Sequence, residues 1–61
     1  MDILIRIIKE DKDADDFFPL PEKYHKYLPK NGDYIVIENK TYHVLYIEFN
    51  YDFARIIIVA R

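Results

Sequence analysis

The sequence predicts one small, mainly β domain over residues 1–61, with four antiparallel strands in meander order that curl into a half-barrel or form an open sheet. Four runs rich in β-branched and aromatic residues carry this prediction, because segments with turn-forming residues separate them. The 61 residues include one glycine and no cysteine, and 51% of them are apolar. One core can form, but a chain of this length has no room for a second one.

The first run extends from Asp2 to Lys9 and contains four isoleucines. Isoleucine loses side-chain freedom in a helix and packs well in a sheet, so a strand is favoured over two helical turns. The next segment, Glu10 to Asp16, has five acidic residues in seven positions. Such a run of charge resists burial and is expected to form a solvated loop.

A proline-rich segment follows from Phe17 to Pro29. Its prolines at positions 19, 21 and 29 exclude a central strand, because proline has no N–H to donate to the ladder. Pro21 and Glu22 suit the first turn of a short helix, of about two turns, before the last proline. Gly32 then supplies turn chemistry ahead of the next apolar run.

Three further strands are predicted at Tyr34–Glu38, Thr41–Asn50 and Phe53–Ala60. The two-residue connections Asn39-Lys40 and Tyr51-Asp52 predict hairpins between them. Both faces of the last strand are apolar, so we expect it to be covered on both sides. The expected architecture is an SH3-like half-barrel or curled sheet, with a short helix or proline-rich excursion before the second strand.

Charge and composition narrow the classes of function. The net charge is -2, and residues 1–19 carry six acids against three bases. There is no glycine-rich phosphate loop, no HExxH motif and no nucleophile elbow, and a core this small leaves little room for a catalytic pocket. We therefore expect no enzymatic activity and no cofactor. The lack of cysteine, secretory leader and long apolar stretch favours a cytoplasmic location.

The surplus of apolar side chains predicts a surface that binds protein. Whichever register holds, the outer face of the sheet would retain several of Leu4, Ile8, Tyr42, Val44, Tyr46, Ile56 and Ile58. A patch of this kind is typical of contact with a partner, and a homodimer is the commonest solution. We expect Tyr42 and Tyr46 to belong to this contact surface.

The acidic run is the second predicted contact surface. Clustered carboxylates attract a basic partner over a distance or imitate a phosphate track. The candidate residues are Asp11, Asp13, Asp15 and Asp16. The alternate aspartates, with Glu22 beyond them, also reproduce part of a calcium-loop spacing, although Asp16 stands where such a loop needs glycine.

A nucleic-acid-binding barrel is the alternative function. Small β-barrels stack bases on exposed aromatic rings beside basic side chains. The candidates for this role are Tyr24, Tyr27, Lys26 and Lys30. The acidic balance of the whole chain weakens the attraction to phosphate, so the protein-binding interpretation is favoured.

The residues Pro29-Lys30-Asn31-Gly32-Asp33-Tyr34-Ile35-Val36-Ile37, followed by Tyr42-His43-Val44, form a P-x-x-G-D-x-I-x-I…Y-x-V pattern. This pattern resembles one found in short β domains of bacterial and phage origin. The resemblance covers about a quarter of the chain and implies a fold rather than an activity. Together with the small size, it suggests an accessory protein of a phage or mobile element that inhibits or regulates a host protein by binding it.

Overall fold

The structure is a computed structural model that describes residues 2–10 and 14–61. Its strands are β1 (Asp2–Ile7), β2 (Asp16–Pro19), β3 (Tyr34–Ile37), β4 (Lys40–Asn50) and β5 (Arg55–Ala60). One short 3-10 helix, η1 (Glu22–Tyr24), lies between β2 and β3. The predicted mainly β class is confirmed.

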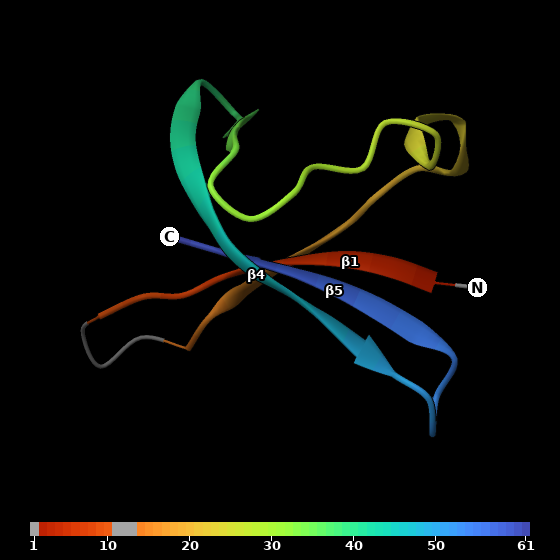
Figure 1. Ribbon diagram of the computed structural model, residues 1–61. Coiled ribbons are helices and arrows are strands. Elements are labelled where there is room, and N and C mark those ends of the chain that lie inside the picture. Colours follow the sequence, from red (N-terminus) through yellow and green to blue (C-terminus); the bar gives the residue numbers. More distant parts are fainter. Residues whose placement is uncertain (1, 11–13) are drawn as a thin grey trace.

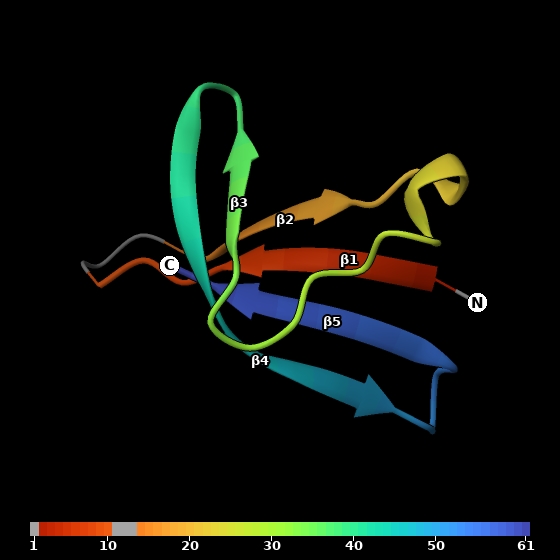
Figure 2. The same ribbon diagram turned by 45° about the horizontal axis from the view of Figure 1, so that its top comes forward.

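The strands form one five-stranded sheet in the order β2-β1-β5-β4-β3 (Figure 2). β1 pairs with β5 in parallel, and every other neighbouring pair is antiparallel. The prediction of four antiparallel strands is therefore wrong in two respects: β2 is an additional strand, and the sheet is mixed. The prolines of residues 17–29 were predicted to exclude a central strand there. This prediction is confirmed, because β2 is an edge strand, a position that tolerates proline.

The sheet curls into a half-barrel because β4 belongs to two pairings. Lys40 to His43 pair with β3, whereas Val44 and Tyr46 to Asn50 pair with β5. The register shifts between Val44 and Tyr46, so Leu45 is an extra residue in the ladder. A bulge of this kind bends the strand and increases its twist. In Figure 1 the β3–β4 hairpin accordingly stands up from the plane of β1 and β5.

The core lies on the concave face of this sheet. Its buried members come from the three central strands and are Ile3, Ile5, Ile7, Val44, Ile58 and Ala60. The register explains the set, because Ile5 lies opposite Ile58 and Ile7 lies opposite Ala60 in the parallel pair. The last strand was predicted to be covered on both sides, and Ile57 to Ala60 are all buried.

Both hairpin turns lie close to their predicted positions. Ile37 pairs with Lys40, so the first turn is Glu38-Asn39, one residue before the prediction. Both turn residues have positive φ, 51° and 66°, which is the combination of a type I′ turn. The second connection is longer than predicted, because Asn50 pairs with Arg55 and four residues lie between them.

The segment from Leu20 to Gly32 is more extended than predicted. The helix of about two turns is wrong: η1 contains only three residues, and Pro21 immediately precedes it. The imidazole Nε2 of His25 lies 3.0 Å from the Leu20 carbonyl oxygen and fixes η1 to the end of β2. The turn before β3 is confirmed, with Gly32 at φ 90°.

Candidate functional site

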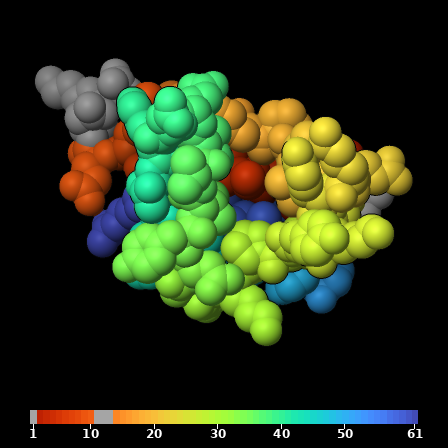
Figure 3. Space-filling model, turned by 90° about the horizontal axis from the view of Figure 1, so that it is seen from above, coloured from red at the N-terminus to blue at the C-terminus, as the bar shows by residue number. Residues whose placement is uncertain are grey.

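An apolar groove of about 570 Å³ runs across the concave side of the half-barrel. One wall is the end of β2 with η1 and the following residues, and the other wall is β3. Figure 3 shows the hollow between the green β3–β4 hairpin and the yellow segment around η1. The groove exists because the curled sheet does not close: its two edge strands are the two ends of the order β2-β1-β5-β4-β3.

The floor of the groove is the core itself. Ile5 and Ile58 line it, and both are buried. Phe18, Leu20, Tyr24 and Tyr27 line the β2–η1 wall, and Ile35 and Ile37 line the β3 wall. Among the described residues, all those that line this groove are apolar, aromatic or proline. Such a surface favours apolar side chains over a charged small molecule.

The edge of β3 that faces away from β4 offers free backbone groups. His43 donates its N–H to the Arg61 carbonyl and accepts the Arg61 N–H, at 2.9 and 3.1 Å between N and O. Opposite residues of an antiparallel pair direct their backbone groups both toward or both away from each other. Tyr34 lies opposite His43, so Tyr34, and Val36 two residues later, direct their N–H and C=O groups away from β4.

The free edge of β2 is partly blocked. The Leu20 N–H donates to the Ile3 carbonyl at 2.9 Å, so Leu20 directs its backbone groups toward β1. The preceding residue, Pro19, therefore has its nitrogen on the outer edge, where proline has no hydrogen to donate. This edge carries charge as well, because Asp16 is its first residue.

Basic residues are frequent in the segment that forms the η1 wall. Residues 20–30 contain three lysines and one glutamate, although the whole chain has a net charge of -2. The Lys23 ammonium lies 5.1 Å from the centre of the Tyr24 ring, within the range of a cation–π contact. Lys26 and Lys30 are exposed, and the Lys30 N–H donates to the Asp33 carboxylate at 2.8 Å. The groove therefore has an apolar lining, and the segment that forms its η1 wall carries more bases than acids.

Two of the four predicted nucleic-acid candidates line the groove. Tyr24 and Tyr27 line the groove, and Lys26 and Lys30 lie in the same segment. The apolar lining residues Phe18, Leu20, Ile35 and Val36 were not predicted as functional. The run Phe17-Phe18-Pro19-Leu20-Pro21 carried a usable signal, since exposed apolar side chains between prolines are typical of a binding surface.

The predicted acidic surface is only partly described. Asp11 and Asp13 lie outside the described residues. The Asp15 carboxylate accepts a hydrogen bond from the Lys9 N–H at 3.1 Å and another from Arg6 Nε at 2.8 Å. These two bonds lower the pKa of Asp15 and hold its charge in place. Asp16 pairs with the Lys9 ammonium at 3.1 Å, so both described carboxylates of the cluster have partners within the chain.

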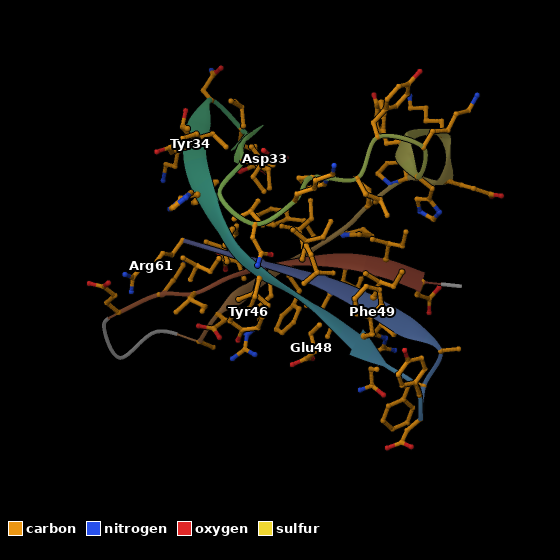
Figure 4. All side chains as sticks on the ribbon, viewed as in Figure 1. Asp33, Tyr34, Tyr46, Glu48, Phe49 and Arg61 are labelled. Atoms are coloured by element: carbon orange, nitrogen blue, oxygen red, sulfur yellow. The ribbon has the colours of Figure 1, made fainter. Side chains whose placement is uncertain are left out.

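Tyr42 and Tyr46 do not share a surface. Tyr42 is half-buried and packs against the core on the concave face. Tyr46 lies opposite Val59 on the convex face, and Figure 4 shows it on the side of the sheet away from Asp33 and Tyr34. Leu45 explains the difference, because an extra residue reverses the alternation of side chains beyond it. Val44 and Ile58, two other candidates for the outer face, are buried in the core.

Within residues 2–10 and 14–61, no group of three histidine, aspartate or glutamate side chains is placed to hold a metal ion. β2 also separates Asp15 from Glu22, so the partial calcium-loop spacing does not form one loop. No helix in the described part is long and apolar enough to cross a membrane. Comparison with protein-family models, curated proteins and solved structures finds no match.

Proposed function

We propose that this chain is a non-enzymatic protein-binding module that uses the open groove and its rims as the contact surface and that also self-associates as a homodimer. The observation that carries the proposal is the amount of apolar surface left exposed. Ten large apolar side chains of residues 2–10 and 14–61 are exposed, and Tyr51, Tyr27, Tyr34, Phe53 and Val36 are at least two-thirds accessible. Exposed apolar surface on this scale is typical of an interaction site.

The total accessible area supports the same conclusion. The chain exposes 4876 Å², whereas a compact monomer of 7.4 kDa is expected to expose about 4,200 Å². The excess of about 700 Å² is close to the roughly 800 Å² that each partner contributes to a standard interface. A single contact of ordinary size would therefore cover the surplus.

The resemblance to short phage and bacterial β domains extends the proposal to a biological role. A module of this size that binds protein would act as an accessory factor, by inhibiting or regulating a host protein. The acidic residues have a secondary part in this proposal, since the carboxylates of Asp15 and Asp16 are already paired with Arg6 and Lys9.

Light scattering combined with site-specific cross-linking tests the proposal. The solution mass is measured over a hundredfold range of protein concentration, with a photoreactive benzoylphenylalanine in place of Val36 at the groove or of Tyr51 in the β4–β5 turn. We expect a rise toward the dimer mass, and protein adducts at position 36 in excess of those at position 51. Tyr51 is the control because it is exposed but does not line the groove, so its adducts report contacts made outside the groove.

A strict monomer whose two photoreactive variants give equal adducts, alone and in lysate, would contradict the proposal. A monomer with adducts specific to position 36 would remove the homodimer and retain the binding module.

Nucleic-acid binding is the second candidate, and one observation favours it. The exposed rings of Tyr24 and Tyr27 lie in the same segment as Lys23, Lys26 and Lys30. Stacking of bases on these rings would quench tyrosine fluorescence on addition of single-stranded oligonucleotide, and added salt would reverse the quenching. Unchanged fluorescence at low salt would exclude this candidate.

A further inference from the structure

We propose that Asn31 is a site of covalent self-modification, at which the backbone nitrogen of Gly32 displaces the side-chain nitrogen of Asn31 as ammonia. We further propose that the hydrogen bond from Gly32 to Val44 controls the rate of this reaction. The only co-reactant is water. The modification belongs to the turn before β3 and is independent of the proposed protein-binding function.

The sequence around Asn31 suits the reaction better than that around the other asparagines. The chain has asparagine at positions 31, 39 and 50, followed by glycine, lysine and tyrosine respectively. The attacking nitrogen must approach the Cγ atom of the asparagine, and a Cβ on the following residue hinders this approach, whereas glycine has none. The side-chain oxygen of Asn50 is also engaged, because it accepts the Phe53 N–H at 3.2 Å.

The turn that contains Asn31 is open to solvent. Asn31 and Gly32 are both exposed, and among the described residues outside the turn itself no atom lies within 4 Å of the position that a Cβ of Gly32 would take. Two hydrogen bonds close the turn around this pair. The Asp33 N–H donates to the Lys30 carbonyl at 3.0 Å, and the Lys30 N–H donates to the Asp33 carboxylate at 2.8 Å. Water therefore reaches the amide of Asn31 in the folded chain.

The attacking nitrogen is held by the sheet. The Gly32 N–H donates to the Val44 carbonyl at 2.9 Å, and the Val44 N–H donates to the Asp33 carbonyl at 2.8 Å. Val44 is 1% exposed, so both bonds are anchored in the core. While its N–H is bound to Val44, the Gly32 nitrogen cannot lose its proton and turn toward Asn31. The reaction therefore needs a local opening of this end of the β3–β4 pairing.

The reaction balances with water as the only reagent. The Gly32 nitrogen forms a bond to Cγ of Asn31, and the side-chain nitrogen leaves as ammonia with the proton that Gly32 has lost. The product is a cyclic imide. Water then opens one of its two carbonyl–nitrogen bonds. Opening at Cγ gives aspartate, and opening at the backbone carbonyl gives isoaspartate, in which the chain continues through the side-chain carbon.

Isoaspartate at position 31 would weaken the start of β3. Its backbone has an additional atom, so the nitrogen of Gly32 no longer lies at the position from which it reaches Val44. Tyr34, the first residue of β3, is only two residues further along the chain. Pro29 and Ile35, on either side of the turn, both line the groove. The modification would therefore loosen the groove wall as well as the strand.

The rates in the folded chain and in a peptide of residues 29–35 test the site and its control. Both are incubated at the same mildly alkaline pH, and the modified fraction at each asparagine is measured by mass spectrometry. We expect Asn31 to react at least about fivefold more slowly in the folded chain, the factor that follows from the net strength of one backbone hydrogen bond. Unfolding the chain in urea should remove this difference.

Two outcomes would overturn the proposal at this stage. Equal rates in the folded chain and the peptide would show that the bond to Val44 does not control the reaction. Faster modification at position 39 or 50 than at position 31 in the unfolded chain would remove Asn31 as the site. A peptide that carries Gly32→Ala is the control and should react more slowly, because the added Cβ hinders the attack.

Urea titration of the purified isoaspartate form tests the structural consequence. Asn31→Asp is the matched control, because it has the same added charge and an ordinary backbone. We expect the ratio of folded to unfolded chain to be about 5- to 30-fold lower for the isoaspartate form than for Asn31→Asp, since one or two backbone hydrogen bonds are lost. Equal stability of the two forms would overturn the loss of the bond to Val44.

Discussion

The two edge strands of the sheet, β2 and β3, both leave backbone N–H and C=O groups unpaired on their outer side, and they differ in how these groups are protected. Both are four residues long, and in the described ranges neither has a strand on its outer side. β2 contains Asp16 at its start and Pro19 at its end, whereas β3 contains neither charge nor proline between Asp33 and Glu38. β3 therefore has fewer of the features by which natural edge strands avoid pairing.

The contacts that hold the two edge strands in place also differ. β2 is held by the ion pair between Arg6 and Asp15, with 2.7 Å between Nη2 and Oδ2. β3 is held by the type I′ turn and by the ring of Tyr34 stacked on His43, with the ring centres 4.9 Å apart. Four experiments test this difference, in descending order of the effect that we expect.

Ile58→Ala should have the largest effect, because Ile58 is the shared floor between the two edges and is 1% exposed. Truncation of a buried isoleucine costs about 2–5 kcal/mol, and a chain of this length has a free energy of unfolding of about 3–9 kcal/mol. We expect the variant to be largely unfolded in circular dichroism and urea titration. Ile58→Val should lose only about 0.5–1.5 kcal/mol, and equal losses would refute the role of Ile58 as floor.

Pro19→Val replaces the proline on the outer edge of β2 by a residue that is common in strands. The variant gains an N–H on the outer edge, so self-association should become about tenfold tighter if one or two new backbone hydrogen bonds form at about 1 kcal/mol each. Val36→Lys is the reciprocal change and should weaken association through β3. Analytical ultracentrifugation of both variants measures the effects, and identical behaviour would remove the distinction between the edges.

Tyr34→Ala removes the ring that stacks on His43 on the β3 side. Aromatic pairs contribute about 0.5–1.5 kcal/mol, and the 72% exposure of Tyr34 favours the lower end of that range. Urea titration measures the loss. Tyr51→Ala is the control, because the Tyr51 ring is 90% exposed and has no ring stacking among the described residues, and it should leave the unfolding free energy unchanged.

Asp15→Asn removes the carboxylate of the ion pair beside β2, and the pH dependence of the unfolding free energy tests the contribution of that pair. The Lys9 N–H and the Arg6 guanidinium hold the pKa of Asp15 below its ordinary value. A lowered pKa in the folded chain gives stability that is present above the pKa of the unfolded chain and is lost as pH falls through the pKa of the folded chain. The wild type should therefore lose slightly more stability than Asp15→Asn on acidification, and parallel melting curves would contradict this assignment.

Local pattern was sufficient to predict much of the fold. The β-branched residues of β1 and β5, the turn at Gly32 and the hairpin near Asn39 all lie where their propensities indicated. Burial of both faces of β5 was also predictable, because Ile56 to Ala60 contain no polar residue. These features depend on residues that are close in sequence, which is why single-sequence reasoning reaches them.

The errors arise where distant residues decide the structure. The parallel pairing of β1 with β5 joins residues more than fifty positions apart, and no local signal specifies it. Leu45 reverses the alternation within β4, so Tyr42 and Tyr46 were placed on one face although they lie on opposite faces. The groove was missed for the same reason, since β3 and the η1 segment line it only after the whole sheet has curled.

The parallel pair of β1 and β5 has a consequence for the order of folding. β1 can pair with β2 as soon as both have been synthesised, but its second neighbour is the last strand in the order of elements. Most of the core isoleucines therefore remain uncovered until β5 has left the ribosome, and such non-local pairing is intrinsically slow. A nascent chain would therefore present its apolar β1 to other molecules throughout the interval between the emergence of β1 and that of β5.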